Sequence, residues 1–142
     1  MPVTIPNTHG DLLQKPVHGV LTTMMPEGVP QSSIVWVDYD GEDVLINTTL
    51  ERQKGRNMQA NPKVTVLVID PQDSSRWIEV RGLVRGMTRD SAEVHADKLT
   101  QRYCPGKRHF YGDIYPPEQK EKETRVIVKI PPIKITLDAI FR

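Results

Sequence analysis

The chain has 142 residues and a formal net charge of +1, from 19 Lys and Arg against 18 Asp and Glu, which argues against a protein that neutralises many phosphates. Balanced charges at 26% of the residues exclude a disordered composition, and a single cysteine excludes a disulfide framework or a Cys-rich zinc site. The length predicts one domain over residues 1–142, large enough to bury a core without such cross-links.

The sequence also predicts where the protein works. Its first residues, from Met1 to His9, have neither the basic start nor the apolar run of a secretory signal. No stretch approaches the roughly 20 apolar residues that a membrane-spanning helix needs. We therefore expect a cytoplasmic protein that does not bind membranes.

The first half of the chain predicts short strands separated by turns. Residues 5–15 favour an N-terminal arm with one short helix, which Gly10 weakens. Period-two patterns rich in β-branched residues predict strands at 18–25, 31–38 and 44–49. The strand at 31–38 has apolar side chains on both faces, which predicts that both faces are covered. The basic segment 50–61 predicts a loop and a short helix that ends at Pro62.

The second half adds strands and the clearest helix. Strands are predicted at 63–70, 76–87, 124–130 and 133–137, with bends or bulges at Gly82 and Gly86. Residues 90–103 predict a helix, in which Asp90 and Glu93 have the spacing of a capping box. Residues 107–123 predict a long loop. Six or seven largely antiparallel strands with few helices predict a mainly β fold, a small β-barrel with flanking helices.

The familiar catalytic motifs are missing from the sequence. There is no Gly-x-Ser-x-Gly, Walker A, Gly-x-Gly-x-x-Gly or His-Glu-x-x-His sequence. The four histidines lack metal-ligand spacing, which predicts structural roles for them and no metal site. Without an acid–base pair or a nucleophile, the sequence favours chemistry carried by a cofactor.

A basic segment is the first candidate binding feature. Arg52, Lys54 and Arg56 alternate between the end of a strand and the start of a helix, which is a common way to present donors to a phosphate. Further donors lie close in sequence, and these are Thr48, Thr49 and Asn57. An ordinary exposed basic loop is the alternative interpretation.

Two further features fit a flat ring. Gln31, Ser32 and Ser33 place amide and hydroxyl groups where Thr48 and Thr49 can lie beside them, as the polar edge of a heteroaromatic ring requires. Ordinary polarity at the start of a strand explains the same residues. Trp77 lies on the mixed-polarity face of a long strand, where it can cover a ring, fill the core or form a dimer interface.

The order of these pieces resembles a known superfamily. The succession is Gly19-Val-Leu-Thr-Thr, Gly28-Val-Pro-Gln-Ser-Ser, Arg52-Gln-Lys-Gly-Arg-Asn, Asn61-Pro-Lys-Val-Thr-Val-Leu, Arg76-Trp-Ile-Glu-Val-Arg-Gly and Arg125-Val-Ile-Val. Over residues 12–137 the chain resembles the pyridoxamine 5′-phosphate oxidase-like split-barrel superfamily. It is most similar to the branch that uses the deazaflavin coenzyme F420.

The resemblance implies a fold, an assembly and a site. It implies a six-stranded antiparallel split barrel and an obligate homodimer with two cofactor sites in the interface. Arg52 and Lys54 match phosphate-binding positions, and Trp77 matches a ring-side position reached from the partner chain. Ring-lining positions match Gln31, Ser33 and Thr49. Arg56 and Asn57 either match cofactor-binding positions or hold the loop that carries them. Arg125 is a further candidate for cofactor binding.

The implied function is oxidoreduction. We expect F420 to transfer hydride to a small organic acceptor beside Trp77 and the 103–115 segment. FMN in place of F420, and a carrier that binds such a cofactor without turnover, are the alternatives. The chain lacks the Arg-rich C-terminal end of true pyridoxamine phosphate oxidases, which argues against oxidation of vitamin B6. Balanced charge argues against a nucleic-acid-binding barrel.

Overall fold

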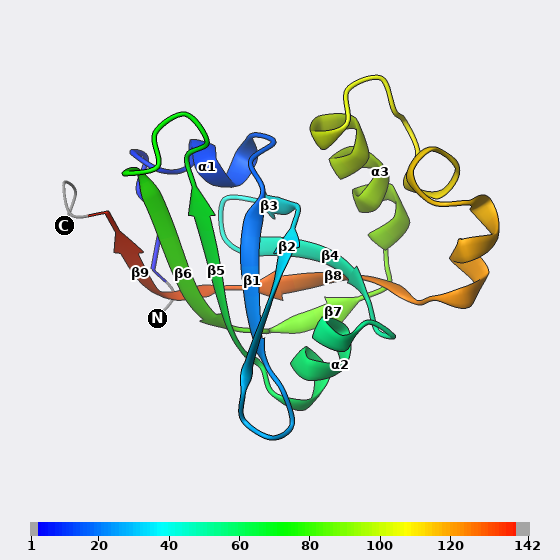
Figure 1. The fold of residues 1–142 in the computed structure, drawn as a ribbon, viewed down its shortest axis with the longest axis horizontal. Helices are drawn as coiled ribbons and strands as arrows, with labels where there is room; N and C mark the ends of the chain where they lie inside the picture. Colours follow the sequence, from blue (N-terminus) through cyan, green and yellow to red (C-terminus); the bar gives the residue numbers. More distant parts are fainter. Residues whose placement is uncertain (1–2, 139–142) are drawn as a thin grey trace.

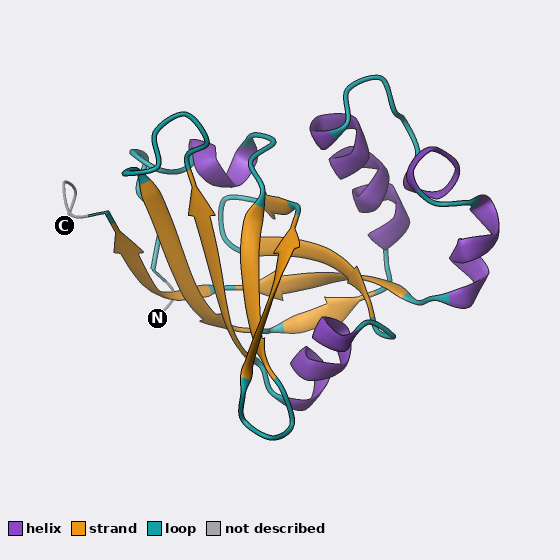
Figure 2. Cartoon of the chain, in the orientation of Figure 1, coloured by secondary structure: helices purple, strands orange, loops and turns teal. Residues whose placement is uncertain are grey.

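The computed structural model describes residues 3–138 and consists of two antiparallel sheets with helices around them (Figure 1, Figure 2). Sheet A contains, in spatial order, β2 (Pro30–Val35), β1 (Gly19–Met24), β5 (Lys63–Ile69), β6 (Trp77–Leu83) and β9 (Pro132–Leu137). Sheet B contains β3 (Val37–Tyr39), β4 (Val44–Thr49), β8 (Arg125–Ile130) and β7 (Gly86–Thr88). The predicted mainly β fold is confirmed, while the two ends of the predicted domain lie outside the described residues.

The chain passes from one sheet to the other without a long loop. It does so between β2 and β3 at Trp36, between β6 and β7, and between β8 and β9. The single strands predicted at 31–38 and 76–87 are therefore wrong, because each is divided between the two sheets. The predicted irregularity at Gly82 is confirmed by a register shift, and there a Cβ atom would lie 2.6 Å from Ile130 and 2.7 Å from the Pro131 carbonyl. Only glycine allows the strands to cross so closely.

Aliphatic side chains from both sheets form the core. Alternate residues of β5 are buried, and those that point outward are exposed or half-buried, as a strand with one covered face requires. Fully buried examples are Leu21, Val66, Ile78, Ile46 and Val128. The chain has few aromatic residues, and they contribute little to this core.

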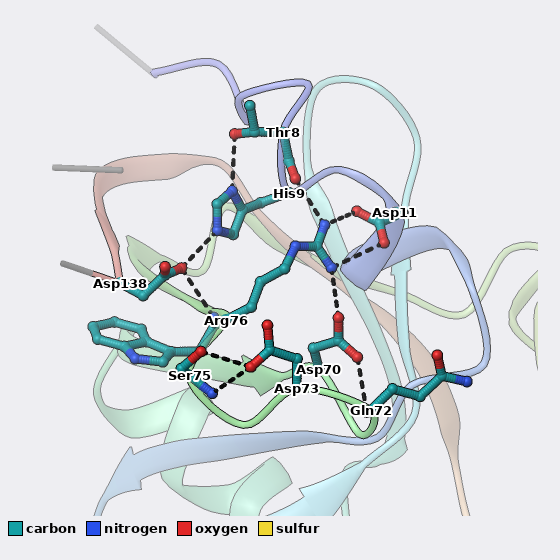
Figure 3. Close-up of polar contacts among 10 residues, drawn as sticks. Thr8, His9, Asp11, Asp70, Gln72, Asp73, Ser75, Arg76 and Asp138 are labelled. Carbon is teal, nitrogen blue, oxygen red and sulfur yellow. Dashed lines mark hydrogen bonds and ion pairs between the residues drawn. The ribbon is translucent and has the colours of Figure 1, made fainter. Parts of the chain in front are cut away.

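The N-terminal arm is tied to sheet A by charged groups (Figure 3). Arg76 pairs with Asp11 and with Asp70, the latter at 2.9 Å, and donates to the Thr8 carbonyl at 2.7 Å. Buried His9 lies 2.8 Å from Asp138, which follows β9. In this arm the helix α1 (Asp11–Gln14) is much shorter than the predicted segment 5–15.

The remaining helices follow the predicted places with two corrections. These helices are α2 (Gln53–Ala60), α3 (Ala92–Tyr103), the π-helical turn η1 (Phe110–Ile114) and the 3-10 helix η2 (Pro117–Lys122). The predicted capping box is wrong, because Ser91 is the N-cap of α3 with a φ of 62° and makes no side-chain cap. Glu93 instead pairs with Lys120 at 2.9 Å. The segment predicted as a long loop contains η2 and the tight turn η1, in which Tyr111 and Gly112 have non-helical backbone angles.

The helices take separate places around the sheets. Figure 1 shows α3, η1 and η2 together on the side away from both chain ends, with α2 below the strands.

No helix between residues 3 and 138 has both the length and the apolar character needed to cross a bilayer.

Candidate functional site

A cavity of about 300 Å³ lies where both sheets, α2 and η1 meet. Its walls come from the bend between β2 and β3, the end of β4, the N-terminal side of α2, η1 with the residue after it, and the start of β8. The lining residues are His18, Ile34, Val35, Trp36, Asn47, Thr48, Arg52, Lys54, Phe110, Ile114, Tyr115 and Arg125. Its size falls at the lower end of small-molecule sites.

Three cationic side chains line the cavity, and two of them, Arg52 and Lys54, have no carboxylate partner among residues 3–138. Lys54 Nζ donates to Ser33 Oγ at 3.1 Å, and Arg52 donates to the Tyr115 hydroxyl at 3.1 Å. Within residues 3–138, no carboxylate lies within 4.0 Å of the charged nitrogens of Arg52 or Lys54. Burial lowers the pKa of Lys54, and the charges of Arg52 and Arg125 lower it further. Such a group of cations is suited to a bound anion.

The local sequence explains how α2 presents these cations. At Gly55 a Cβ atom would lie 2.0 Å from the Thr49 carbonyl oxygen, so the helix backbone packs directly on the end of β4. Buried Asn57 donates to Thr23 Oγ1 of β1 at 3.0 Å. The helix is thus fixed on two strands, with Arg52 and Lys54 at the cavity.

Arg125 lines the cavity and is almost fully buried. Its Nε donates to the Tyr111 hydroxyl at 3.0 Å, NH1 donates to Asn47 Oδ1 at 3.0 Å, and NH2 donates to Glu123 at 2.7 Å. The guanidinium also lies 4.2 Å from the centre of the Phe110 ring. Burial by itself raises the pKa of Glu123, but hydrogen bonds from Gln119, Tyr111 and Arg125 lower it overall. Arg125 therefore has a well-defined position.

Aromatic side chains form another wall. Trp36 stacks on Tyr103 with ring centres 5.2 Å apart, and the Phe110 ring is perpendicular to Trp36 at 6.1 Å. Thr48 Oγ1, in a residue that lines the cavity, is buried and has no hydrogen-bond partner among the described residues. Cations, an apolar planar wall and an unsatisfied hydroxyl together fit a ligand that carries both an anionic group and a planar ring.

Some predicted site residues meet at this cavity. Thr48, Arg52 and Lys54 line it, and Ser33 contacts Lys54. Five others do not line it, and these are Gln31, Ser32, Thr49, Arg56 and Asn57. Ser32 bonds to Thr22, Arg56 bonds to Gln53 and to the Glu51 carbonyl, and Asn57 fixes α2. The side-chain oxygens of Gln31 and Thr49 are buried without a hydrogen-bond partner within residues 3–138.

Trp77 lies elsewhere in the same chain. It is on the outer face of sheet A, opposite Ile69, where it lines a separate hollow with Leu67, Glu79 and Thr136. Trp77 therefore does not line the cavity of its own chain.

The family resemblance places the 103–115 segment and Arg125 at the site, and Tyr115 and Arg125 do line the cavity, but the sequence does not identify Trp36 or Phe110 as site residues. Trp36 lies in the predicted continuous strand 31–38, and Phe110 lies in the segment predicted as a long loop. Asn47 had a detectable signal, because it is polar within the otherwise apolar start of a strand. These residues become neighbours only through the fold.

The fold and cavity define a class: mainly β proteins in which two antiparallel sheets and a short helix with cationic residues at its start frame a cavity. The family model described as pyridoxamine 5′-phosphate oxidase matches residues 5–137, and the chain belongs to this family. No protein with a curated description matches the chain.

Solved structures agree with this assignment. A protein named F420 reductase is 36% identical, with a TM-score of 0.79 over 93% of this chain and 98% of its own. A conserved hypothetical protein from Mycobacterium tuberculosis is 22% identical, with a TM-score of 0.71 over 96% of this chain and 86% of its own. A putative pyridoxamine 5′-phosphate oxidase from Listeria innocua, also 22% identical, has a TM-score of 0.61 over 89% of this chain and 90% of its own. The last two show a shared fold.

Proposed function

We propose that the protein is an oxidoreductase that binds coenzyme F420 in this cavity and uses it to reduce a small organic acceptor. The observation that carries the proposal is the positive charge of Arg52 and Lys54 at the cavity, which no carboxylate of residues 3–138 pairs with. A phosphate-bearing cofactor supplies the negative charge that these residues lack. The 36% identity to a protein named F420 reductase favours F420 over other ring cofactors.

The residues of the chain would bind and orient the cofactor. Arg52 and Lys54 would hold the phosphate, and the free hydroxyl of Thr48 would bond to the polar edge of the ring. Trp36 and Phe110 would keep water from the ring. The bound cofactor would supply the hydride, and this division of labour fits a chain whose sequence shows no familiar catalytic motif.

Two alternatives are distinguished by binding and turnover. FMN has a phosphate and a similar ring system, so the same cavity fits it. A carrier would bind the cofactor without reducing any acceptor. The predicted cytoplasmic location stays a prediction.

We further propose that two chains form a homodimer through the outer face of sheet A. This face exposes Ile34, Ile69 and Leu83, whose side chains are 63%, 42% and 43% exposed. A second copy would cover this apolar surface and would bring the Trp77 of one chain toward the cavity of the other, as the family resemblance implies.

Cofactor titration tests the site. Wild-type protein is expected to bind F420 more tightly than FMN, measured by fluorescence and difference absorbance. The variant with Arg52→Ala and Lys54→Ala is expected to bind at least about 100-fold more weakly, because charge-assisted contacts to phosphate are lost. The matched control is Lys15→Ala with Lys122→Ala, which removes the same charge from exposed positions that do not line the cavity.

Each outcome decides a different part of the proposal. Equal affinity in wild type and in the Arg52, Lys54 variant contradicts the site. Tighter binding of FMN than of F420 would identify FMN, in place of F420, as the cofactor. Binding of F420 without oxidation of its reduced form by any of a panel of enones and quinones supports the carrier.

A further inference from the structure

A chain of polar side chains runs from the cavity along the face of sheet B that α3 covers. Arg125 NH1 donates to Asn47 Oδ1 at 3.0 Å, and Asn47 Nδ2 lies 3.0 Å from His95 Nδ1. On its other side, His95 Nε2 lies 2.9 Å from Asp38 Oδ2. Arg125, His95 and Asp38 are all buried, with exposed fractions of 6%, 8% and 1%. The chain therefore links β8, β4, α3 and β3 through hydrogen bonds between buried and half-buried side chains.

The neighbours of Asn47 fix the direction of every bond in this chain. Asn47 Nδ2 also donates to the Ala92 carbonyl at 2.8 Å, and its Oδ1 accepts from Arg125. A carbonyl can only accept and a guanidinium can only donate, so a flipped amide would lose both bonds. His95 Nδ1 must then accept from Asn47, and the ring proton on Nε2 must point to Asp38.

Arg125 keeps part of its hydrogen-bonding capacity. A guanidinium has five N–H groups, and Tyr111, Asn47 and Glu123 accept from three different nitrogens. NH1 and NH2 thus each retain one N–H without a partner among the described residues, in a side chain that lines the cavity. The orientation of Asn47 decides where the remaining N–H of NH1 points.

We propose that His95 is a positioning residue for the cavity: by accepting from Asn47 it holds the amide that orients the Arg125 guanidinium. This inference rests on the proposed function, in which the cavity binds an anionic cofactor. His95 does not line the cavity and acts only through Asn47. Its loss would leave one amide N–H of Asn47 unsatisfied and would loosen the guanidinium.

A purely structural role is the competing explanation, because His95 also contacts Asp38, which anchors α3. Two substitutions separate the roles. In His95→Asn the side-chain oxygen stands near the former Nδ1 and accepts from Asn47, but the contact with Asp38 is lost. In His95→Gln the side-chain nitrogen reaches toward the former Nε2 and donates to Asp38, but the acceptor for Asn47 is lost. His95→Leu removes both contacts.

The test compares affinity with stability in these three variants. F420 affinity is expected to stay within about threefold of wild type in His95→Asn and to fall about tenfold in His95→Gln and His95→Leu, the loss expected for a bond that orients a charged group. Thermal stability is expected to follow the opposite order, with His95→Gln more stable than His95→Asn. If affinity follows stability, so that His95→Gln retains F420 binding and His95→Asn loses it, the proposal is overturned.

A second measurement separates this proposal from the proposed function. The ¹⁵N resonance of Arg125 Nε is recorded in protein without cofactor, and it is expected to shift or broaden in His95→Gln and His95→Leu but not in His95→Asn. If wild type binds neither F420 nor FMN, the proposed function fails, and this resonance alone decides the role of His95. An unchanged resonance in all three variants overturns the proposal.

Discussion

Asp38 shows how a single residue joins two parts of the molecule. Its carboxylate, in β3, accepts from His95 at 2.9 Å, Lys98 at 3.2 Å and Arg102 at 2.8 Å, all in α3. Burial on its own raises the pKa of Asp38, but hydrogen bonds from His95, from Arg102 and from the Tyr39 amide outweigh burial and hold the pKa well below its usual range. The ionised carboxylate therefore stabilises the folded chain.

We expect Asp38→Asn to lower the free energy of unfolding by about 2 kcal/mol at pH 7, since it leaves donors of α3 without their anion. A carboxyl whose folded pKa lies below its unfolded value of about 3.9 stabilises above that value and ceases to do so as the pH falls further. The difference between wild type and variant should thus be constant from about pH 5 to 8 and shrink below about pH 4. Urea denaturation across this range measures it.

The control for this prediction is Asp90→Asn, at an exposed carboxyl just before α3. Its effect should stay within about 0.5 kcal/mol at pH 7. A difference between Asp38→Asn and wild type that does not change down to pH 2.5 would contradict the assignment of stability to the charge.

At the scale of elements, the position of α2 depends on a close approach of backbone to backbone. Gly55 of α2 lies against the Thr49 carbonyl at the end of β4, and Asn57, two residues later, is bonded to β1. This packing explains why a short helix with a weak apolar face is stable here. It also sets where Arg52 and Lys54 lie relative to Arg125.

In an ordinary helix, Gly→Ala stabilises by up to about 1 kcal/mol. We expect Gly55→Ala to destabilise by about 2 kcal/mol instead, because the new methyl group meets the Thr49 carbonyl and α2 must shift. Cofactor affinity should fall with it, since Lys54 moves with the helix. Chemical denaturation and cofactor titration measure the two effects.

Gly10→Ala is the matched control, because the nearest atom to an added Cβ there is the Pro6 carbonyl oxygen at 3.8 Å. This variant should keep both stability and affinity. A Gly55→Ala protein that is as stable as wild type would show that α2 does not depend on the close packing.

At the scale of the whole molecule, the exposed apolar residues of sheet A bear on whether the functional unit is one chain or the proposed homodimer. One face of the sheet packs on the core, while the other exposes Ile34, Ile69 and Leu83 together with half-buried Leu67 and Trp77. The proposed dimer would bury this face and would complete each cavity with residues from a second chain. Assembly and cofactor binding should therefore change together.

Light scattering after size-exclusion chromatography tests the assembly. Wild type is expected to have the mass of two chains, and the variant with Ile69→Lys and Leu83→Lys the mass of one, because buried lysines would face apolar surface. Val94→Lys, at a residue of α3 that is 71% exposed, should leave the mass unchanged. A wild-type mass of one chain would contradict the dimer.

Sequence patterns predicted which segments are extended, apart from the breaks within 31–38 and 76–87, and also the places of α2 and α3 and the cationic segment around Arg52. These properties are local, because alternation of apolar residues, helix periodicity and a run of basic residues can each be recognised within about ten positions. The order of motifs also resembled a family to which the chain belongs.

The division of the strands between two sheets, and the contacts between residues far apart in the chain, depend on tertiary packing. Periodicity shows that one face of 76–87 is buried, but the crossing at Gly82 depends on Ile130 and Pro131, far along the chain. In the same way, Arg52 meets Tyr115, and Arg125 meets Asn47, at sequence separations of 63 and 78 residues. Such contacts arise from the packing of complete sheets and helices, and no local pattern in the sequence specifies them.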